Sequence, residues 1–232
     1  MGEPDALSIS TFFHQLGFKI EIAKRTQKQL DLYLATGMNI VRDYIQPDEN
    51  RISDMLADLL TPDGSHGQGS VFLGLFLKEV GLSYKVEDAD FARIREHSTS
   101  GGRRIDILLP FTGKKAIGIE NKPFAADQLN QVNDYCDYLH DRYAGEYVLF
   151  YLTPGGFNPP PESIREEKRT ELMALGKLCC ISYQADITRW LENCFRECKA
   201  ERVRWLLKDL IDFIDERLGD DGPEEGGIGD AE

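Results

Sequence analysis

Two short apolar runs, each carrying one acidic residue, lie close together in the middle of the chain. The first run, RIDILL, contains Asp106, and the second, IGIENK, contains Glu120. Isoleucine and leucine fill both runs and Thr112–Lys115 separates them, which predicts two buried strands joined by a turn. A carboxylate in a buried strand is costly unless a cation or hydrogen bonds compensate its charge. These two acids therefore constrain the fold and its chemistry more than any other feature.

Lys122 follows Glu120 by two positions. Side chains two apart on a strand share a face, so Lys122 and Glu120 point the same way, whereas Ile119 points to the opposite face. A structural ion pair between Lys122 and Glu120 is the simplest explanation of this pattern. Two acids on neighbouring strands together with a lysine also predict a site for a divalent metal ion. The residues alone leave both explanations open.

The order of these residues resembles the PD-(D/E)xK nuclease superfamily. Asp106 matches the first acid of that pattern, and Glu120-Asn121-Lys122 matches its (D/E)xK element. Ile105 stands where the pattern has proline, a departure that many members share. The resemblance implies an α/β, restriction-endonuclease-like core, in which a central mixed β-sheet is flanked by helices, with extra N- and C-terminal helices.

A helix is expected to follow Asp48, which is a suitable N-cap, and to run to Leu60. Glu49 lies at the start of the apolar stripe that this helix turns towards the core. A first-turn acid is also favoured by the helix dipole alone. The resemblance implies instead that Glu49 reaches the metal site, as an acid on the first core helix does in much of the superfamily.

The loop after this helix extends the similarity to one subgroup of the superfamily. The matching residues are Glu49, Ser53, Leu56, Leu59, Leu60, Pro62 and His66-Gly67-Gln68-Gly69. We expect the loop to be exposed. His66 could contact phosphate there or serve only as a turn residue, and we place it outside the catalytic set.

A stripe of neutral polar residues is expected on the next helix, at about residues 125–141. Gln128, Gln131 and Tyr135 recur on it at intervals of three and four. Gln131-x-x-x-Tyr135 resembles the element that follows the catalytic lysine in the RecB-like branch of the superfamily. These side chains could bind a substrate phosphate or orient Lys122, or they could form a plain surface stripe.

The resemblance also implies a mechanism. Oxygen ligands without a His/Cys cluster suit Mg²⁺ or Mn²⁺. Asp106 and Glu120 would bind the ion with the backbone carbonyl of Asn121 and with Glu49, and Lys122 would orient the attacking water. Members of the superfamily hydrolyse phosphodiester bonds, typically in DNA. We therefore expect a Mg²⁺-dependent deoxyribonuclease.

The net charge of −13 argues at first against a nucleic-acid partner. Residues 219–232 hold six of the acids and no base, so the rest of the chain carries −7. This glycine-rich acidic tail is expected to be disordered. No stretch has the length or flanks of a membrane span or signal, and the five cysteines lack disulfide-scaffold spacing, which favours a cytoplasmic protein without a membrane partner. Cutting a duplex at two positions would favour a homodimer.

The domain organisation expected is one nuclease-like domain over residues 1–218. It would comprise a helical N-terminal part (1–80), a catalytic core (about 48–183) and C-terminal helices (185–218), followed by the tail. Further elements are expected as helices at about 7–16, 19–36, 40–45, 71–80 and 162–175, an edge strand at about 83–97, and strands at 147–152 and 178–183.

Two other kinds of protein fit parts of the pattern. A catalytically inactive nuclease-like module would bind nucleic acid or regulate without cutting, and it would not hold Mn²⁺ at Asp106 and Glu120. A structural interaction protein would use Glu120 and Lys122 only as an ion pair. In that case Glu120→Ala would destabilise the fold by several kcal/mol, as expected for a broken buried pair.

Overall fold

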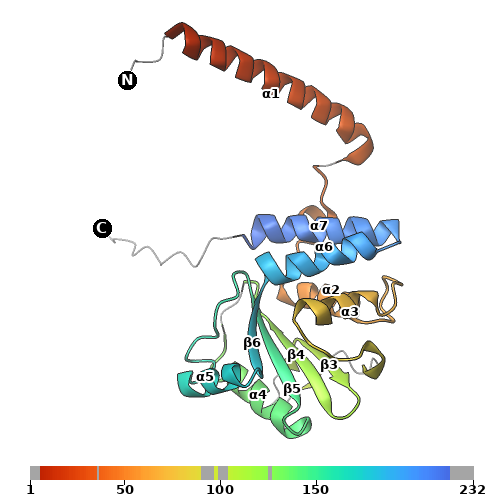
Figure 1. Cartoon of the computed structure of the whole chain (residues 1–232), viewed down its shortest axis with the longest axis vertical. Helices are drawn as coiled ribbons and strands as arrows, with labels where there is room; N and C mark the ends of the chain where they lie inside the picture. Colours follow the sequence, from red (N-terminus) through yellow and green to blue (C-terminus); the bar gives the residue numbers. More distant parts are fainter. Residues whose placement is uncertain (1–5, 36, 90–96, 99–103, 125–126, 220–232) are drawn as a thin grey trace.

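A mixed sheet in the order β3-β4-β5-β6 lies at the centre of the computed structural model, which describes residues 6–35, 37–89, 97–98, 104–124 and 127–219 (Figure 1). The strands are β3 (Ile107–Phe111), β4 (Lys115–Asn121), β5 (Tyr147–Thr153) and β6 (Leu178–Ser182). Strands β3 and β4 are antiparallel, and the other neighbours are parallel. The predicted α/β class with a mixed sheet between helices is confirmed.

The predicted hairpin forms between β3 and β4. All residues of β3 and β5 are buried, as expected for strands covered on both faces. The turn at Thr112–Lys114 includes Gly113 with φ of 75°, a left-handed conformation that glycine adopts without strain. The prediction fails at Asp106, which lies in a bend between β2 (Arg104–Ile105) and β3 instead of inside one strand.

Helices cover both faces of the sheet (Figure 1). On one face a large core joins the sheet to α2 (Glu49–Leu60), α3 (Val71–Glu79), α6 (Thr188–Glu197) and α7 (Glu201–Arg217). The other face packs against α4 (Gln131–Arg142) and α5 (Glu166–Ala174).

Gly118 of β4 allows α4 to approach the sheet. A Cβ atom at Gly118 would lie 3.0 Å from the Leu149 side chain and 3.2 Å from the Leu139 side chain of α4. The close approach brings the first turn of α4 over the carboxyl end of β4.

The N-terminal region differs from the prediction of two helices. One helix, α1 (Ala6–Leu34), runs through Gly17, because a glycine inside a helix costs only about 1 kcal/mol. Leu34 ends the helix before Ala35, whose φ is 45°. The resumed helix expected near residue 40 is a single π-helical turn, η1 (Val41–Ile45).

Other boundaries also shift. Of the edge strand expected at 83–97, the described residues retain only an isolated bridge between Ala89 and Phe111 and the pairing of His97 with Ile105. Residues 86–88 form the 3₁₀ turn η2 (Val86–Asp88), and residues 90–96 lie outside the described residues. The short strand β1 (His97–Ser98) pairs with β2. A π-helical turn, η4 (Tyr183–Ile187), precedes α6. Of the predicted tail, 219–232, all residues after Gly219 lie outside the described residues.

Among the described helices, none combines the length and apolar character needed to cross a membrane.

Candidate active site

The β3–β4 hairpin places the two predicted acids side by side. Ile107 of β3 pairs with Ile119 of β4 at the end of the antiparallel ladder. Asp106, which precedes Ile107, and Glu120, which follows Ile119, are therefore neighbours just beyond that pair. The backbone N–H of Asn121 donates a 2.8 Å hydrogen bond to Asp106 Oδ2. The bend at Asp106 thus turns its carboxylate towards the end of β4.

Lys122 connects this pair to the first core helix. Its Nζ lies 2.7 Å from Glu120 Oε1 and 3.2 Å from Glu49 Oε1. Glu49 begins α2, and the side chain of Asp48 accepts a hydrogen bond from the Arg51 N–H as the predicted N-cap. The structure therefore brings Glu49, Asp106, Glu120 and Lys122 together from elements far apart in the sequence.

Burial and mutual repulsion shape the charges of this cluster. Glu120 is fully buried, and burial together with the Asp106 charge raises its pKa well above the ordinary value. Burial also raises the pKa of Asp106. For Lys122, burial acts to lower the pKa, but the surrounding carboxylates outweigh it and raise the pKa above its ordinary value. Lys122 is therefore protonated and surrounded by three acidic side chains.

One carboxylate oxygen of this cluster lacks a partner. Glu120 Oε1 accepts from Lys122 and, at 2.6 Å, from Gln131 Nε2, whereas the buried Oε2 has no hydrogen-bond partner among the described residues. Buried polar atoms are nearly always paired, so this oxygen is an exception that a bound cation, or a proton shared with Asp106, would explain. An oxygen beside a second carboxylate suits a hard divalent cation such as Mg²⁺ or Mn²⁺.

The described residues contain no group of three or more His, Cys, Asp or Glu side chains arranged to bind a metal ion. The donor set present is smaller. Asp106 and Glu120 face each other, while Glu49 is held by Lys122. Such a set fits an ion that keeps several waters, as Mg²⁺ does.

Gln131 and Tyr135 of α4 form buried hydrogen bonds that hold the site in place. Both are buried, so the surface-stripe alternative is wrong for them. Besides Glu120, Gln131 Nε2 reaches Tyr135 Oη at 3.2 Å, and that hydroxyl donates to the Arg104 carbonyl at 2.7 Å. Burial raises the pKa of Tyr135 to about 12. The two side chains hold Glu120 and the strand that leads into Asp106.

The start of α4 differs from the prediction. The helix begins at Gln131 and not near residue 125, because Asn130 adopts a left-handed conformation with φ of 57°. Leu129, which the predicted helix would have included, precedes α4 and is exposed. Gln128 is also exposed, and its backbone N–H donates to Gln131 Oε1 at 3.0 Å.

The side chain of Asn121 is a structural element that the sequence analysis missed. It points away from Glu120 and is fully buried. Its Nδ2 donates to Ser53 Oγ at 2.9 Å, and its Oδ1 accepts from the Tyr183 hydroxyl at 2.6 Å. Ser53 Oγ in turn donates to the Glu49 carbonyl at 2.9 Å. This network fixes the start of α2 against β4, and strand alternation at Asn121 was the available signal.

Asp127 anchors the segment before α4 and was also missed. Its carboxylate accepts hydrogen bonds from the Tyr151 hydroxyl and, at 3.0 Å, from Ser163 Oγ. Burial and the Asp127 charge raise the pKa of Tyr151 above its ordinary value. Nothing in the local sequence marked Asp127, because both donors are remote in the chain.

His66 has a structural role. It is buried, its ring stacks on Phe72, its Nδ1 accepts from the Gln68 N–H at 3.0 Å, and its Nε2 lies 2.9 Å from the Thr61 carbonyl. The ring closes the loop after α2, which is therefore only partly exposed.

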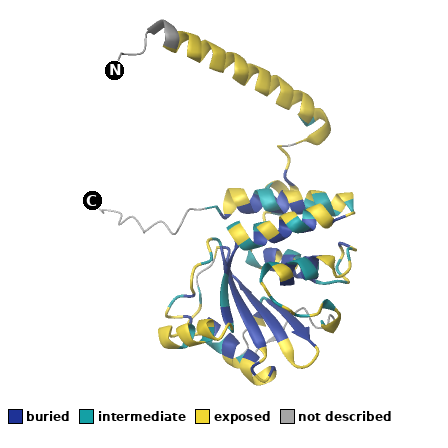
Figure 2. Ribbon diagram, viewed as in Figure 1, coloured by how far each residue is buried: buried dark blue, intermediate teal, exposed yellow. Residues whose placement is uncertain are grey.

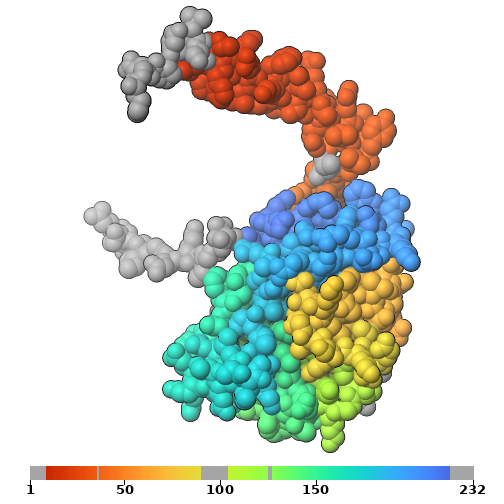
Figure 3. All heavy atoms as spheres, viewed as in Figure 1, coloured from red at the N-terminus to blue at the C-terminus, as the bar shows by residue number. Residues whose placement is uncertain are grey.

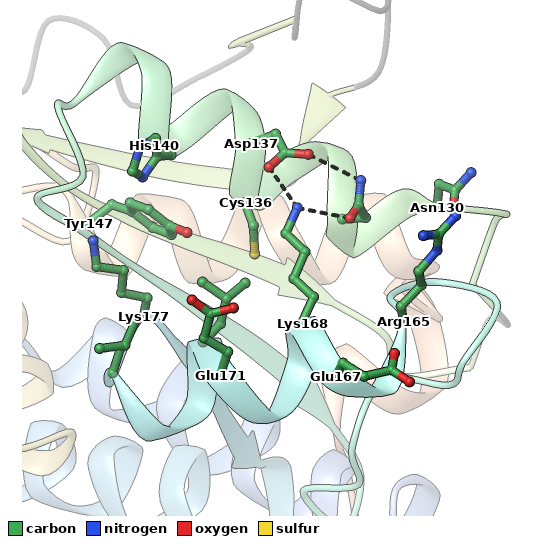
Figure 4. Close-up of a pocket in the computed structure, with 13 residues that line it drawn as sticks. Asn130, Cys136, Asp137, His140, Tyr147, Arg165, Glu167, Lys168, Glu171 and Lys177 are labelled. Carbon is green, nitrogen blue, oxygen red and sulfur yellow. Dashed lines mark hydrogen bonds and ion pairs between the residues drawn. The ribbon is translucent and has the colours of Figure 1, made fainter.

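A separate cavity of about 830 Å³ opens between α4 and α5 (Figure 4). Lys168 of α5 points across it to Asp137 Oδ1 at 2.6 Å and to Asn133 Oδ1 at 2.9 Å. Tyr147 and Lys177 line its far end. This cavity lies on the opposite side of α4 from Gln131 and Tyr135 and does not include the acidic cluster.

Comparison with known proteins bears on the chain as a whole. The family model described as PD-(D/E)XK nuclease superfamily matches residues 39–213, or 175 of 232 residues. The mixed sheet flanked by helices is consistent with the restriction-endonuclease-like class. No curated protein and no solved structure matches the chain.

Proposed function

Because this chain belongs to the PD-(D/E)XK nuclease superfamily, we propose that it is a metal-dependent nuclease that hydrolyses phosphodiester bonds in DNA. The observation that carries the proposal is the orphan oxygen of Glu120, buried beside Asp106 and Lys122. A fold keeps a buried carboxylate oxygen without a hydrogen-bond partner at a cost, which favours a functional role for it.

The residues fit Mg²⁺ or Mn²⁺. Asp106 and Glu120 would hold the ion, with Glu49 and the backbone carbonyl of Asn121 completing the protein ligands. When bound, such an ion polarises the scissile phosphate and lowers the pKa of water at the site.

The protein's own side chains divide the remaining work. Lys122 keeps its proton, so it can donate a hydrogen bond to the attacking water and stabilise the negative charge that develops on the phosphate. Gln131 holds Glu120 in one orientation through its 2.6 Å hydrogen bond. Glu49, whose side chain is 25% exposed, lies on the solvent side of Lys122, where substrate would enter.

Gln128 is a further candidate for substrate contact. It is exposed next to Gln131, so its side chain is free to approach a phosphate once the site is occupied. The buried Gln131 and Tyr135 would act on substrate only through Glu120 and the Asp106 strand.

The experiment that tests this proposal uses supercoiled plasmid and single-stranded circular DNA. Each is incubated with the purified chain and Mg²⁺, Mn²⁺ or EDTA, with Asp106→Asn as the matched variant. We expect metal-dependent cleavage that the variant and EDTA abolish, and the preferred DNA form identifies the substrate class.

Two other outcomes would separate the alternatives. Absence of both cleavage and Mn²⁺ binding would favour the catalytically inactive nuclease-like module. Binding of Mn²⁺ without cleavage would indicate that another substrate or an activating partner is required.

A further inference from the structure

Helix α1 stands clear of the rest of the molecule (Figures 1 and 3). From Ile9 to Leu34 every residue is exposed except Asp31, which is half-buried (Figure 2). The exposed side chains include many large apolar ones: Ile9, Phe12, Phe13, Leu16, Phe18, Ile20, Ile22, Leu30, Leu32, Tyr33 and Leu34. Helices in water draw most of their stability from packing, and such an apolar surface marks an interaction site.

The spacing of these residues identifies the kind of partner. Positions 9, 13, 16, 20, 23, 27, 30 and 34 alternate in steps of four and three, and seven of the eight are apolar. This seven-residue repeat continues along a helix of about 43 Å and is typical of a coiled coil. The exception is Gln27, whose side-chain Nε2 donates a 3.1 Å hydrogen bond to Asp31 Oδ1 on its own helix.

Charge next to the stripe determines the direction of pairing. In a parallel pair of identical helices, Lys19 of one copy would lie against Lys24 of the other, and like charges at these flanking positions repel. An antiparallel pair avoids this contact. It places Lys19 beside Thr26, and Phe12 beside Tyr33.

The stripe is self-complementary in the antiparallel arrangement. With the two-fold axis between Glu21 and Ile22, every position of the stripe has a partner: Ile9 with Leu34, Phe13 with Leu30, Leu16 with Gln27, and Ile20 with Ala23. No position is left over at either end.

The surface beyond the end of α1 continues this stripe. An apolar cavity of about 610 Å³ lies between α7 and the segment that follows α1, and Leu34, Met38, Ile40 and the half-exposed Trp205 line it. In the antiparallel pair, Ile9 of the second copy would lie beside Leu34. The N-terminal end of the second helix would therefore reach this cavity.

We propose that α1 is a dimerisation helix whose partner is α1 of a second copy, in an antiparallel two-stranded coiled coil. The contact is isologous, as in most homodimers. The two nuclease-like domains lie at opposite ends of the helix pair.

The first experiment measures the mass of the full-length chain by light scattering over a concentration series. We expect a dimer for the wild type, a monomer for Ile20→Asp and a dimer for Ile22→Asp. Ile20 and Ile22 are a matched pair, because they are 46% and 49% exposed on the same helix but only Ile20 lies in the stripe. Near-UV circular dichroism, which reports on the buried aromatic side chains of the nuclease-like domain, checks that this domain keeps the wild-type fold in both variants.

The second experiment fixes the direction of pairing. In a Cys179→Ser, Cys180→Ser background, which removes the two half-exposed cysteines, Leu16→Cys chains are oxidised alone or mixed with Gln27→Cys chains. Antiparallel pairing gives a disulfide-linked dimer only in the mixture. Self-linking of Leu16→Cys chains would contradict it.

Three results would overturn dimerisation through α1. The wild type could remain monomeric at every concentration, or both aspartate variants could weaken the dimer equally. The third result is binding of wild-type monomer to vesicles of phosphatidylcholine and phosphatidylglycerol that depends on both Ile20 and Ile22, which would make α1 a membrane-surface helix.

Discussion

Two lysines on opposite sides of α4 make ion pairs of nearly equal length, yet they lie in different environments. Lys122 is 2.7 Å from Glu120 and its side chain is 6% exposed, whereas Lys168 is 2.6 Å from Asp137 and 32% exposed. Glu49 and Asp106 add further negative charge around Lys122. Lys168 has the Asn133 side chain as its second partner.

The difference shows that ion-pair distance does not identify a functional site. Near Lys168 the charges are partly solvated, and such pairs contribute little to stability. Near Lys122 the fold gathers three acidic side chains around one ammonium group, raises the pKa of Asp106 and Glu120, and leaves a carboxylate oxygen of Glu120 without a partner. Burial and the clustering of acids, rather than contact distance, distinguish the side of α4 at which we propose the active site.

The largest effect is expected from the two lysines themselves. Lys122→Ala should reduce metal-dependent DNA cleavage by about 10²- to 10³-fold, as removal of one transition-state donor does. Lys168→Ala should cleave at the wild-type rate in the same plasmid assay. An equal loss of cleavage activity in the two variants would contradict the distinction drawn between the two lysines.

A second matched pair lies on α4. Gln131→Ala removes the hydrogen bond that orients Glu120, and such supporting contacts typically contribute about 10- to 100-fold to metal affinity. Asn133, two residues further and facing Lys168, should have no effect when changed to alanine. Calorimetric titration with Mn²⁺ measures both, and unchanged affinity in Gln131→Ala would remove that residue from the account.

The buried network behind the site should affect stability. Tyr183→Phe leaves Asn121 Oδ1 without its 2.6 Å donor in a fully buried position, at an expected cost of about 1–3 kcal/mol. The exposed Tyr44 provides the control, because Tyr44→Phe should change stability by less than about 0.5 kcal/mol. Urea denaturation of both variants measures the difference, and equal values would argue against the network.

The smallest effect is expected for the partly exposed ion pair. Lys168→Met should lower the free energy of unfolding by about 0.2–1 kcal/mol, and salt should reduce the loss further. Urea denaturation at low and high ionic strength provides the values. A loss of several kcal/mol would mean that the pair is effectively buried.

The acidic residues of the candidate site could be predicted from the sequence, because charged side chains are unusual in apolar runs. Asp106 and Glu120 stood out as acids in apolar runs, and the structure places both beside Lys122 and Glu49. The sheet strands could likewise be predicted, because continuous apolar runs between turn residues leave few other structures.

Features that depend on distant partners could not be predicted. Tyr183 meets Asn121 across 62 residues of sequence, and Asp127 meets Ser163 across 36. The local sequence pattern also gave wrong helix boundaries. Gly17 does not interrupt α1, and α4 begins only after Asn130. Both outcomes depend on small backbone energies that tertiary context decides.

The central claim is that the buried Glu120 carboxylate belongs to a metal site. Titration of the metal-free wild-type chain and of Glu120→Gln with Mn²⁺ by calorimetry tests it most directly, because the variant keeps the side-chain shape and removes only the charge. The account predicts binding by the wild type and none by the variant. Equal binding by both, or none by the wild type, would contradict it.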